Sequence, residues 1–191
     1  TSIKSKTEGY VNGIVTVVGG ESIKSGSMIS GLDSLQMEIR GRGNSTWMHP
    51  KKPYQMKLED KATFLDMPND KKWIFLAEYS DKTMLRNTMA FEMGYASSLD
   101  WTPAGEFAEV YINGAYNGAY HITQKVEEKS NRVDIGNDGF LLEIDQIERI
   151  DEDDHYVSTN EFPVINIKEP DINDIIEDDG IGKADSTIAK I

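Results

Sequence analysis

Apolar and polar side chains alternate along several stretches of this chain. Leu35, Met37 and Ile39 take every second position of one stretch, and residues 54–58 repeat the pattern. A period of two residues is typical of a strand with one face in the core. The run 73–77 is apolar without alternation, which indicates either a buried strand or the lead-in to a helix. Strands are predicted at residues 10–18, 35–40, 54–59, 107–112, 116–123, 140–145 and 162–168.

The connections indicate how these strands pair. Asn113-Gly114 is a strong hairpin signal, and the second Asn-Gly, at 117–118, indicates a bulge in the returning strand. One helix is predicted at residues 81–98, with Ser80 or Asp81 as its N-cap. The predicted fold class is therefore α+β, a mainly antiparallel sheet with one long helix packed on it.

The predicted helix carries an acid on its apolar side. At 100° per residue Met84, Thr88 and Phe91 share one face, and Glu92 falls inside that mostly apolar arc. A carboxylate in a core-facing arc needs a cationic or hydrogen-bonding partner, or it stays protonated. The alternative is that the arc faces water near Glu92.

A glycine loop follows the strand at 35–40. It comprises Gly41, Arg42, Gly43, Asn44 and Ser45. Consecutive backbone N–H groups of such a loop can form a concavity that binds anions, and an arginine fork suits phosphate or carboxylate. The alternative is a tight turn whose arginines pair with acids of the same chain.

Charge is distributed unevenly along the 191 residues, whose net charge is −13. Residues 143–191 hold 15 acidic and 4 basic residues, whereas residues 1–142 hold 18 and 16. This balance argues against a nucleic-acid partner, since phosphate contacts need clustered Lys and Arg. No apolar run approaches a membrane span, and there is no cysteine for a disulfide or thiolate metal site. The histidines, His49, His121 and His155, form no zinc pattern.

Five motifs in series resemble the signature of the CotH family, the spore coat protein H-like proteins. They occur in the same order and with compatible spacing over roughly residues 35–170. The motifs are Arg40-Gly-Arg-Gly-Asn-Ser-Thr-Trp47, Pro50-Lys-Lys-Pro-Tyr54, Ser80-Asp-Lys-Thr-Met-Leu-Arg-Asn87, Val110-Tyr-Ile-Asn-Gly114 and Gly139-Phe-Leu-Leu-Glu-Ile-Asp145.

The resemblance implies an atypical protein kinase that phosphorylates serines with ATP and a divalent metal, Mg or Mn. It implies an extracellular or spore-surface location, and a coat protein or complex component as protein substrate. Residues 1–170 resemble the N-terminal lobe of such a kinase. Residues 171–191 then form an acidic segment leading toward a missing C-terminal lobe. That lobe is a further expected partner.

The resemblance also assigns roles at a nucleotide. Lys57, on the strand after the glycine loop, is the candidate lysine for the phosphates, and Glu92 is its candidate helix partner. The two side chains are expected within salt-bridge distance. Residues 41–45 cover the phosphates, and Gln124 and Glu127 bound the segment expected against the adenine.

Two acidic motifs of the family are missing from this sequence. The catalytic and metal-binding aspartates come from motifs of the Asn-x-Asp and Trp-Asp-Phe-Asp type, and the 191 residues contain neither. No catalytic or metal-binding residue is assigned, and the chain alone is expected to bind ATP weakly or undetectably and not to transfer phosphate. An alternative function stays open, a non-catalytic extracellular module that binds a protein or a polysaccharide, for example in a cellulose-degrading complex. Exposed aromatic side chains on a flat sheet face favour that alternative.

Overall fold

The computed structural model describes residues 2–137, 139–146, 155–158 and 164–170. The chain divides into two compact units, Thr1–Val126 and Glu127–Ile191. The predicted extent of the first lobe, residues 1–170, stays a prediction. In the part of the chain that the structure describes, no helix is long and apolar enough to cross a membrane.

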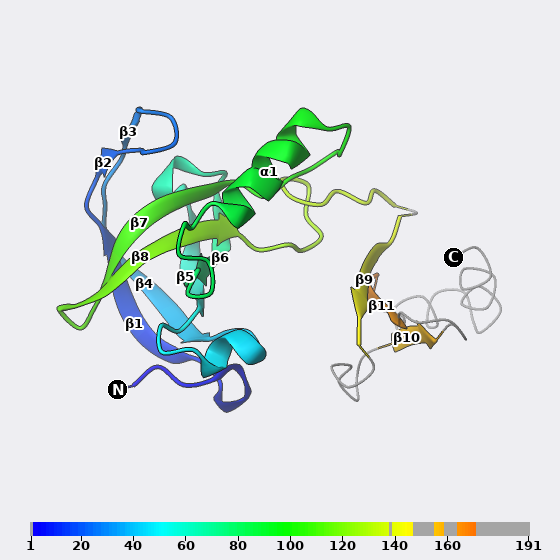
Figure 1. The fold of residues 1–191 in the computed structure, drawn as a ribbon, viewed down its shortest axis with the longest axis horizontal. Coiled ribbons are helices and arrows are strands. Elements are labelled where there is room, and N and C mark those ends of the chain that lie inside the picture. Colours follow the sequence, from blue (N-terminus) through cyan, green and yellow to red (C-terminus); the bar gives the residue numbers. More distant parts are fainter. Residues whose placement is uncertain (1, 138, 147–154, 159–163, 171–191) are drawn as a thin grey trace. The chain divides into compact units, whose positions relative to one another are not determined.

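The first unit is a curled antiparallel sheet with one helix on its outer face (Figure 1). Neighbouring strands pair in the order β1-β4-β5-β6-β8-β7. A two-stranded hairpin and three short 3-10 turns complete the unit. The strands are β1 (Val11–Val17), β2 (Gly20–Glu21), β3 (Met28–Ile29), β4 (Leu32–Gly41), β5 (Tyr54–Ala62), β6 (Asp70–Leu76), β7 (Gly105–Ile112) and β8 (Ala115–Gln124), the turns are η1 (Lys6–Glu8), η2 (Ser45–Met48) and η3 (Phe64–Asp66), and the helix is α1 (Arg86–Ala96).

The hydrophobic core lies on the concave face of the sheet. Met56, Leu58, Trp73 and Tyr120 are fully buried there, on strands where alternate residues point inward. The register explains this arrangement, because Met56 is paired with Trp73 on the neighbouring strand. The predicted α+β fold class, mainly antiparallel, is confirmed.

Strand β6 settles the ambiguous apolar run at 73–77. Trp73 and Phe75 face the core, and Ile74 between them is also buried on the outer face. A strand that is covered on both faces loses its alternation in sequence, so the period of two could not identify it.

The helix is shorter than predicted, and it begins five residues later. Met84 has a positive φ of 57°, which no α-helix allows, so the chain forms turns before Arg86. Asp81 still caps the helix from a distance, since its Oδ2 accepts a hydrogen bond from the Arg86 N–H at 2.9 Å. The helix packs through Phe91 and leaves the predicted apolar arc largely in water, Glu92 included.

The second unit contains a three-stranded antiparallel sheet in the order β10-β11-β9. The strands are β9 (Leu141–Asp145), β10 (His155–Ser158) and β11 (Val164–Glu169). β9 and β11 confirm two predicted strands, although residues 162–163 lie outside the described residues, whereas β10 was not predicted. The acidic segment 171–191 also lies outside the described residues.

Candidate functional site

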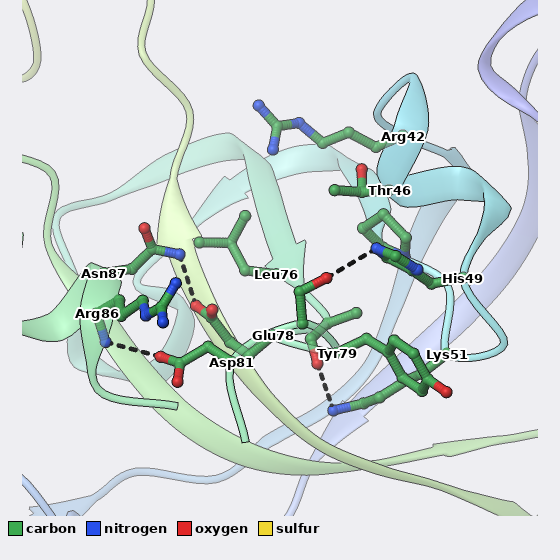
Figure 2. A pocket seen from close by; sticks show the side chains of 13 residues that line it. Arg42, Thr46, His49, Lys51, Leu76, Glu78, Tyr79, Asp81, Arg86 and Asn87 are labelled. Atoms are coloured by element: carbon green, nitrogen blue, oxygen red, sulfur yellow. Dashed lines mark hydrogen bonds between the residues drawn. The ribbon is translucent and has the colours of Figure 1, made fainter. Parts of the chain in front are cut away.

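A pocket of about 280 Å³, lined mostly by polar and charged residues, lies where the chain passes from β6 toward α1. The loop after β4 forms one side of this pocket, and the start of α1 forms the other side (Figure 2). Three of the five sequence motifs contribute side chains to it. The lining residues are Arg42, Thr46, His49, Lys51, Pro53, Leu76, Ala77, Glu78, Tyr79, Ser80, Asp81, Arg86 and Asn87.

Gly41 is required by packing within the protein. Its N–H donates to the Lys4 carbonyl at 2.5 Å, and an added Cβ would lie 2.4 Å from the ring of Trp47. The next residue is also tied down, because the Arg42 N–H donates to the Pro53 carbonyl at 3.1 Å. These two amides are therefore used by the fold and cannot form the predicted anion-binding concavity.

The rest of the glycine loop folds into the turn η2. Gly43 has a φ of 83°, and an added Cβ would lie 2.0 Å from the Thr46 hydroxyl. Asn44 and Ser45 belong to the turn and do not line the pocket, whereas Arg42 and Thr46 do. The loop thus contributes side chains to the pocket, although its expected cover over a nucleotide stays a prediction.

Lys51 supplies a fixed positive charge to the pocket wall. Its Nζ donates to the carbonyl oxygens of Ala77, at 2.7 Å, and of Ala119, and it lies 4.3 Å from the ring centroid of Tyr120. Burial lowers the pKa of the Lys51 amine, the nearby Glu78 carboxylate opposes that shift, and Lys82 adds to it. Because two carbonyls hold the amine in place, its charge is positioned before any ligand arrives.

Glu78 brings a nearly buried carboxylate to the same pocket. Only 5% of its side chain is exposed, and its Oε1 accepts a hydrogen bond from Asn87 Nδ2 at 2.8 Å. His121 Nδ1 lies 3.6 Å from the same oxygen. The backbone φ of Glu78 is 51°, a conformation that is uncommon for residues with a side chain and that clusters at ligand sites.

His121 connects this carboxylate to the helix. Its ring is fully buried between Phe107 of β7, 4.6 Å away between centroids, and Phe91 of α1, 5.5 Å away. Gly105 makes room for the ring, since an added Cβ would lie 2.4 Å from His121 Nε2. His121 therefore has a place in the packing between the sheet and the helix.

The start of α1 adds a second arginine to the pocket. Hydrogen bonds from the Arg86 N–H and from the Thr83 hydroxyl lower the pKa of the Asp81 carboxyl.

His49 Nε2 and the Ser80 hydroxyl are hydrogen bonded at 2.8 Å on the opposite wall. Three cationic side chains and two carboxylates line the pocket, so its charge and its arginine forks suit a phosphate group.

The predicted pair of Lys57 and Glu92 is not formed, so this expectation was wrong. Lys57 lies 3.5 Å from Glu38, which is directly opposite it in the β4–β5 register. Glu92 lies 3.8 Å from Lys24. Both candidates are about half exposed and neither lines the pocket, because an exposed lysine pairs with its cross-strand neighbour and the helix points Glu92 to water. Their roles at a nucleotide stay predictions.

The expected adenine-binding segment is also occupied by contacts within the protein. The Gln124 N–H donates to the Ala104 carbonyl at 3.0 Å, and its buried Oε1 accepts from the Ala104 N–H at 2.9 Å. In the second unit Glu127 forms ion pairs with Lys129 and Arg132, each at 2.9 Å. Neither Gln124 nor Glu127 lines the pocket, and their contact with an adenine stays a prediction.

Sequence reasoning missed the pocket residues that matter most. Lys51 and Arg86 lie in motifs that the resemblance quoted, so their motif membership was an available signal. Glu78 had no signal, because neither its burial nor its positive φ can be read from residue spacing. Among the residues that the structure describes, no group of three His, Cys, Asp or Glu could hold a metal.

Comparison with known proteins agrees with the motifs. A family model described as CotH kinase protein matches residues 39–181, which is most of the chain. This range includes every lining residue of the pocket. Comparisons with curated proteins and with solved structures give no match.

Proposed function

Because the chain belongs to the CotH kinase protein family, we propose that the pocket between the loop after β4 and the start of α1 binds the phosphates of a nucleotide. The kinase family implies ATP and a metal in general. In this proposal the chain is the nucleotide-binding N-terminal part of a secreted or spore-associated serine kinase. Its substrate is a protein, such as a component of a coat or an extracellular complex.

One observation carries the proposal, namely the convergence of motifs on the pocket. Arg42 comes from the first motif, Lys51 from the second and Arg86 from the third, and all three line the same cavity. Residues more than forty positions apart in the chain thereby bring their charges together (Figure 2). A purely structural turn would not require a cation from each segment.

The chemistry of the wall fits a phosphorylated ligand. Arg42 and Arg86 can each form paired hydrogen bonds with phosphate oxygens, and Lys51 adds a point charge. Glu78 repels phosphate but accepts a hydrogen bond from a hydroxyl group. The phosphates are therefore expected at the arginine side of the pocket, with a hydroxyl of the ligand toward Glu78.

The metal is not assigned to residues of this chain. In kinases a divalent ion bridges the phosphates and neutralises developing charge. The described residues offer no group of three suitable ligands, so they do not fit that role.

A titration of the chain with ATP tests the proposal. Backbone NMR shifts are followed at millimolar ATP, because binding by one lobe without metal ligands is expected to be weak. We expect shifts at the pocket residues, and loss of either guanidinium, in Arg42→Gln or Arg86→Gln, weakens binding by about tenfold. Lys61→Gln, which removes an exposed charge of β5, is the matched control and leaves binding unchanged.

The variant Lys57→Gln separates the two assignments of the phosphate site. If the pocket binds the phosphates, Lys57→Gln behaves like Lys61→Gln. ATP shifts around Lys57 that disappear in Lys57→Gln, with no effect of the arginine variants, would instead support the site predicted from the sequence. The absence of any shift at the pocket would refute the proposal.

Polysaccharide binding is the alternative, and one observation bears on it. Tyr111 and Tyr116 are both more than half exposed on the β7–β8 hairpin, with ring centroids 5.2 Å apart. Their rings are tilted by 52°, so they do not form the flat platform on which a sugar chain stacks. The nucleotide function is therefore favoured.

A further inference from the structure

The curled sheet of the first unit ends in two open edges. β1 and β7 are its terminal strands, and in the part of the chain that the structure describes no further strand pairs with either of them. An edge strand offers a row of main-chain donors and acceptors to another chain, and proteins commonly protect such edges with charges or proline. β1 has the sequence Val-Asn-Gly-Ile-Val-Thr-Val, which contains neither.

A groove lined mostly by apolar residues runs between the two edges. It consists of two hollows of about 590 Å³ and 210 Å³, and residues of β1 and of β7 line both of them. Phe75 of β6 forms part of the floor of each hollow, so the groove opens directly onto the core. Val15 from β1 and Val110 from β7 stand on its two sides in both hollows.

The charges around this groove are all of one sign. Among the residues that the structure describes, Glu21 and Glu109 line the larger hollow, the smaller hollow has no charged residue, and no Lys or Arg lines either one. The chain as a whole has a net charge of −13. An occupant with basic side chains is therefore favoured over an acidic one.

We propose that the groove binds an extended polypeptide segment of a partner, with alternating apolar and basic residues, by adding a strand to β1. Main-chain pairing is expected over Val11–Val15, since the β1–β4 register shifts between Val15 and Val17. Apolar side chains of the segment enter the groove and basic ones meet Glu21 and Glu109. A lipid chain would fill the hollows but would leave the donors and acceptors of the edge unused.

This site is separate from the phosphate pocket. The two share no lining residue among those that the structure describes. The groove opens on the core face of the sheet, whereas Lys51 and Glu78 line the phosphate pocket. Failure of one proposal therefore leaves the other untouched.

The test uses the complete 191-residue chain and a synthetic seven-residue peptide of alternating valine and lysine that carries a fluorophore. Fluorescence anisotropy gives the affinity, and amide hydrogen exchange locates the contact. We expect saturable binding and slower exchange of amides in β1. A peptide with the same residues but N-methylated at every second position should bind about tenfold more weakly or worse, because it lacks main-chain donors.

A pair of charge variants tests the role of the acidic rim. Glu109→Lys should weaken binding of the valine–lysine peptide severalfold, whereas Glu59→Lys, an equal charge change on the outer part of β5, should not. Equal affinity of the N-methylated peptide, slowed exchange confined to residues outside β1 and β7, or no binding at about 1 mM peptide would each overturn the proposal.

Discussion

A few residues of this protein have conformations or surroundings that their type alone would not suggest. Glu78 takes a positive φ and places its carboxylate between Asn87 and His121. His121 is wholly buried, and neither of its ring nitrogens has a hydrogen-bond partner among the described residues. The His121 ring is therefore held by its packing, and Gly105, which makes room for the ring, is as important as the ring itself.

Gly105 provides a direct test of that packing. In Gly105→Ala the new methyl group would meet the His121 ring, which cannot move because Phe91 and Phe107 enclose it. We expect a loss of about 1–3 kcal/mol in the free energy of unfolding, measured by urea denaturation. Gly20→Ala is the matched control, since an added Cβ there meets nothing within 4 Å. Equal midpoints for the two variants would contradict the expected overpacking.

At the scale of elements, the start of α1 depends on a single distant cap. Asp81 accepts the Arg86 N–H five residues ahead, and Thr83 donates to the same carboxylate. These hydrogen bonds lower the pKa of Asp81. A carboxyl whose pKa is lowered by folding stabilises the fold above its ordinary pKa, and this contribution is lost as the pH falls through the lowered value.

The helix start is therefore expected to loosen in acid. As the pH falls below about 4, amide exchange at Arg86–Met89 should accelerate relative to the rest of α1. Asp81→Asn should have less protection at neutral pH and a flatter pH dependence, because the charge is gone throughout. Asp60→Asn on β5 serves as control and should retain the wild-type pH profile at these amides. An unchanged profile in Asp81→Asn would exclude this carboxylate as the cap.

The elements also show how far sequence patterns reach. Alternation located β4 and β5, because each has one face in the core, and the Asn113-Gly114 hairpin signal located β7 and β8. Alternation could not place β6, which is buried on both faces, nor the late start of α1, which depends on the conformation of Met84. For the site, motif order identified the segments around the pocket. The predicted pairing of Lys57 with Glu92 was wrong, because Lys57 pairs with its cross-strand neighbour and Glu92 points to water.

At the scale of the whole molecule, the main buried hydrophobic cluster of the described residues lies within the first unit, whereas Val164 and Ile167 are buried in the second unit. Every member of the buried hydrophobic cluster lies between Ile39 and Ile122. We therefore predict that residues 1–126 fold alone, with a cooperative urea transition whose midpoint is close to that of the complete chain. Circular dichroism and urea denaturation measure this. A broad transition, or a fragment without near-ultraviolet signal, would show that residues 127–191 are needed.

Charge bears on the activity of the whole chain. The 191 residues lack both aspartate motifs that the resemblance associates with catalysis, and their net charge of −13 repels a triphosphate. We expect no phosphate transfer to a serine-rich acceptor with Mg-ATP or Mn-ATP, assayed with radiolabelled ATP beside an unrelated serine kinase. Robust transfer would mean that this chain holds catalytic acids, and Glu143, Asp145 and the acids at 151–154 would be the first to replace.

The contacts of Glu78 have one more consequence. Its carboxylate faces the phosphate pocket. One partner, Asn87, lies in the first turn of α1, and the other, His121, contacts Phe91 in the next turn. Helix position and pocket occupancy are therefore thermodynamically linked wherever a ligand disturbs this carboxylate. Such linkage is reciprocal. If fixing the helix raises the ligand affinity by some factor, binding of the ligand shifts the equilibrium between helix positions by the same factor.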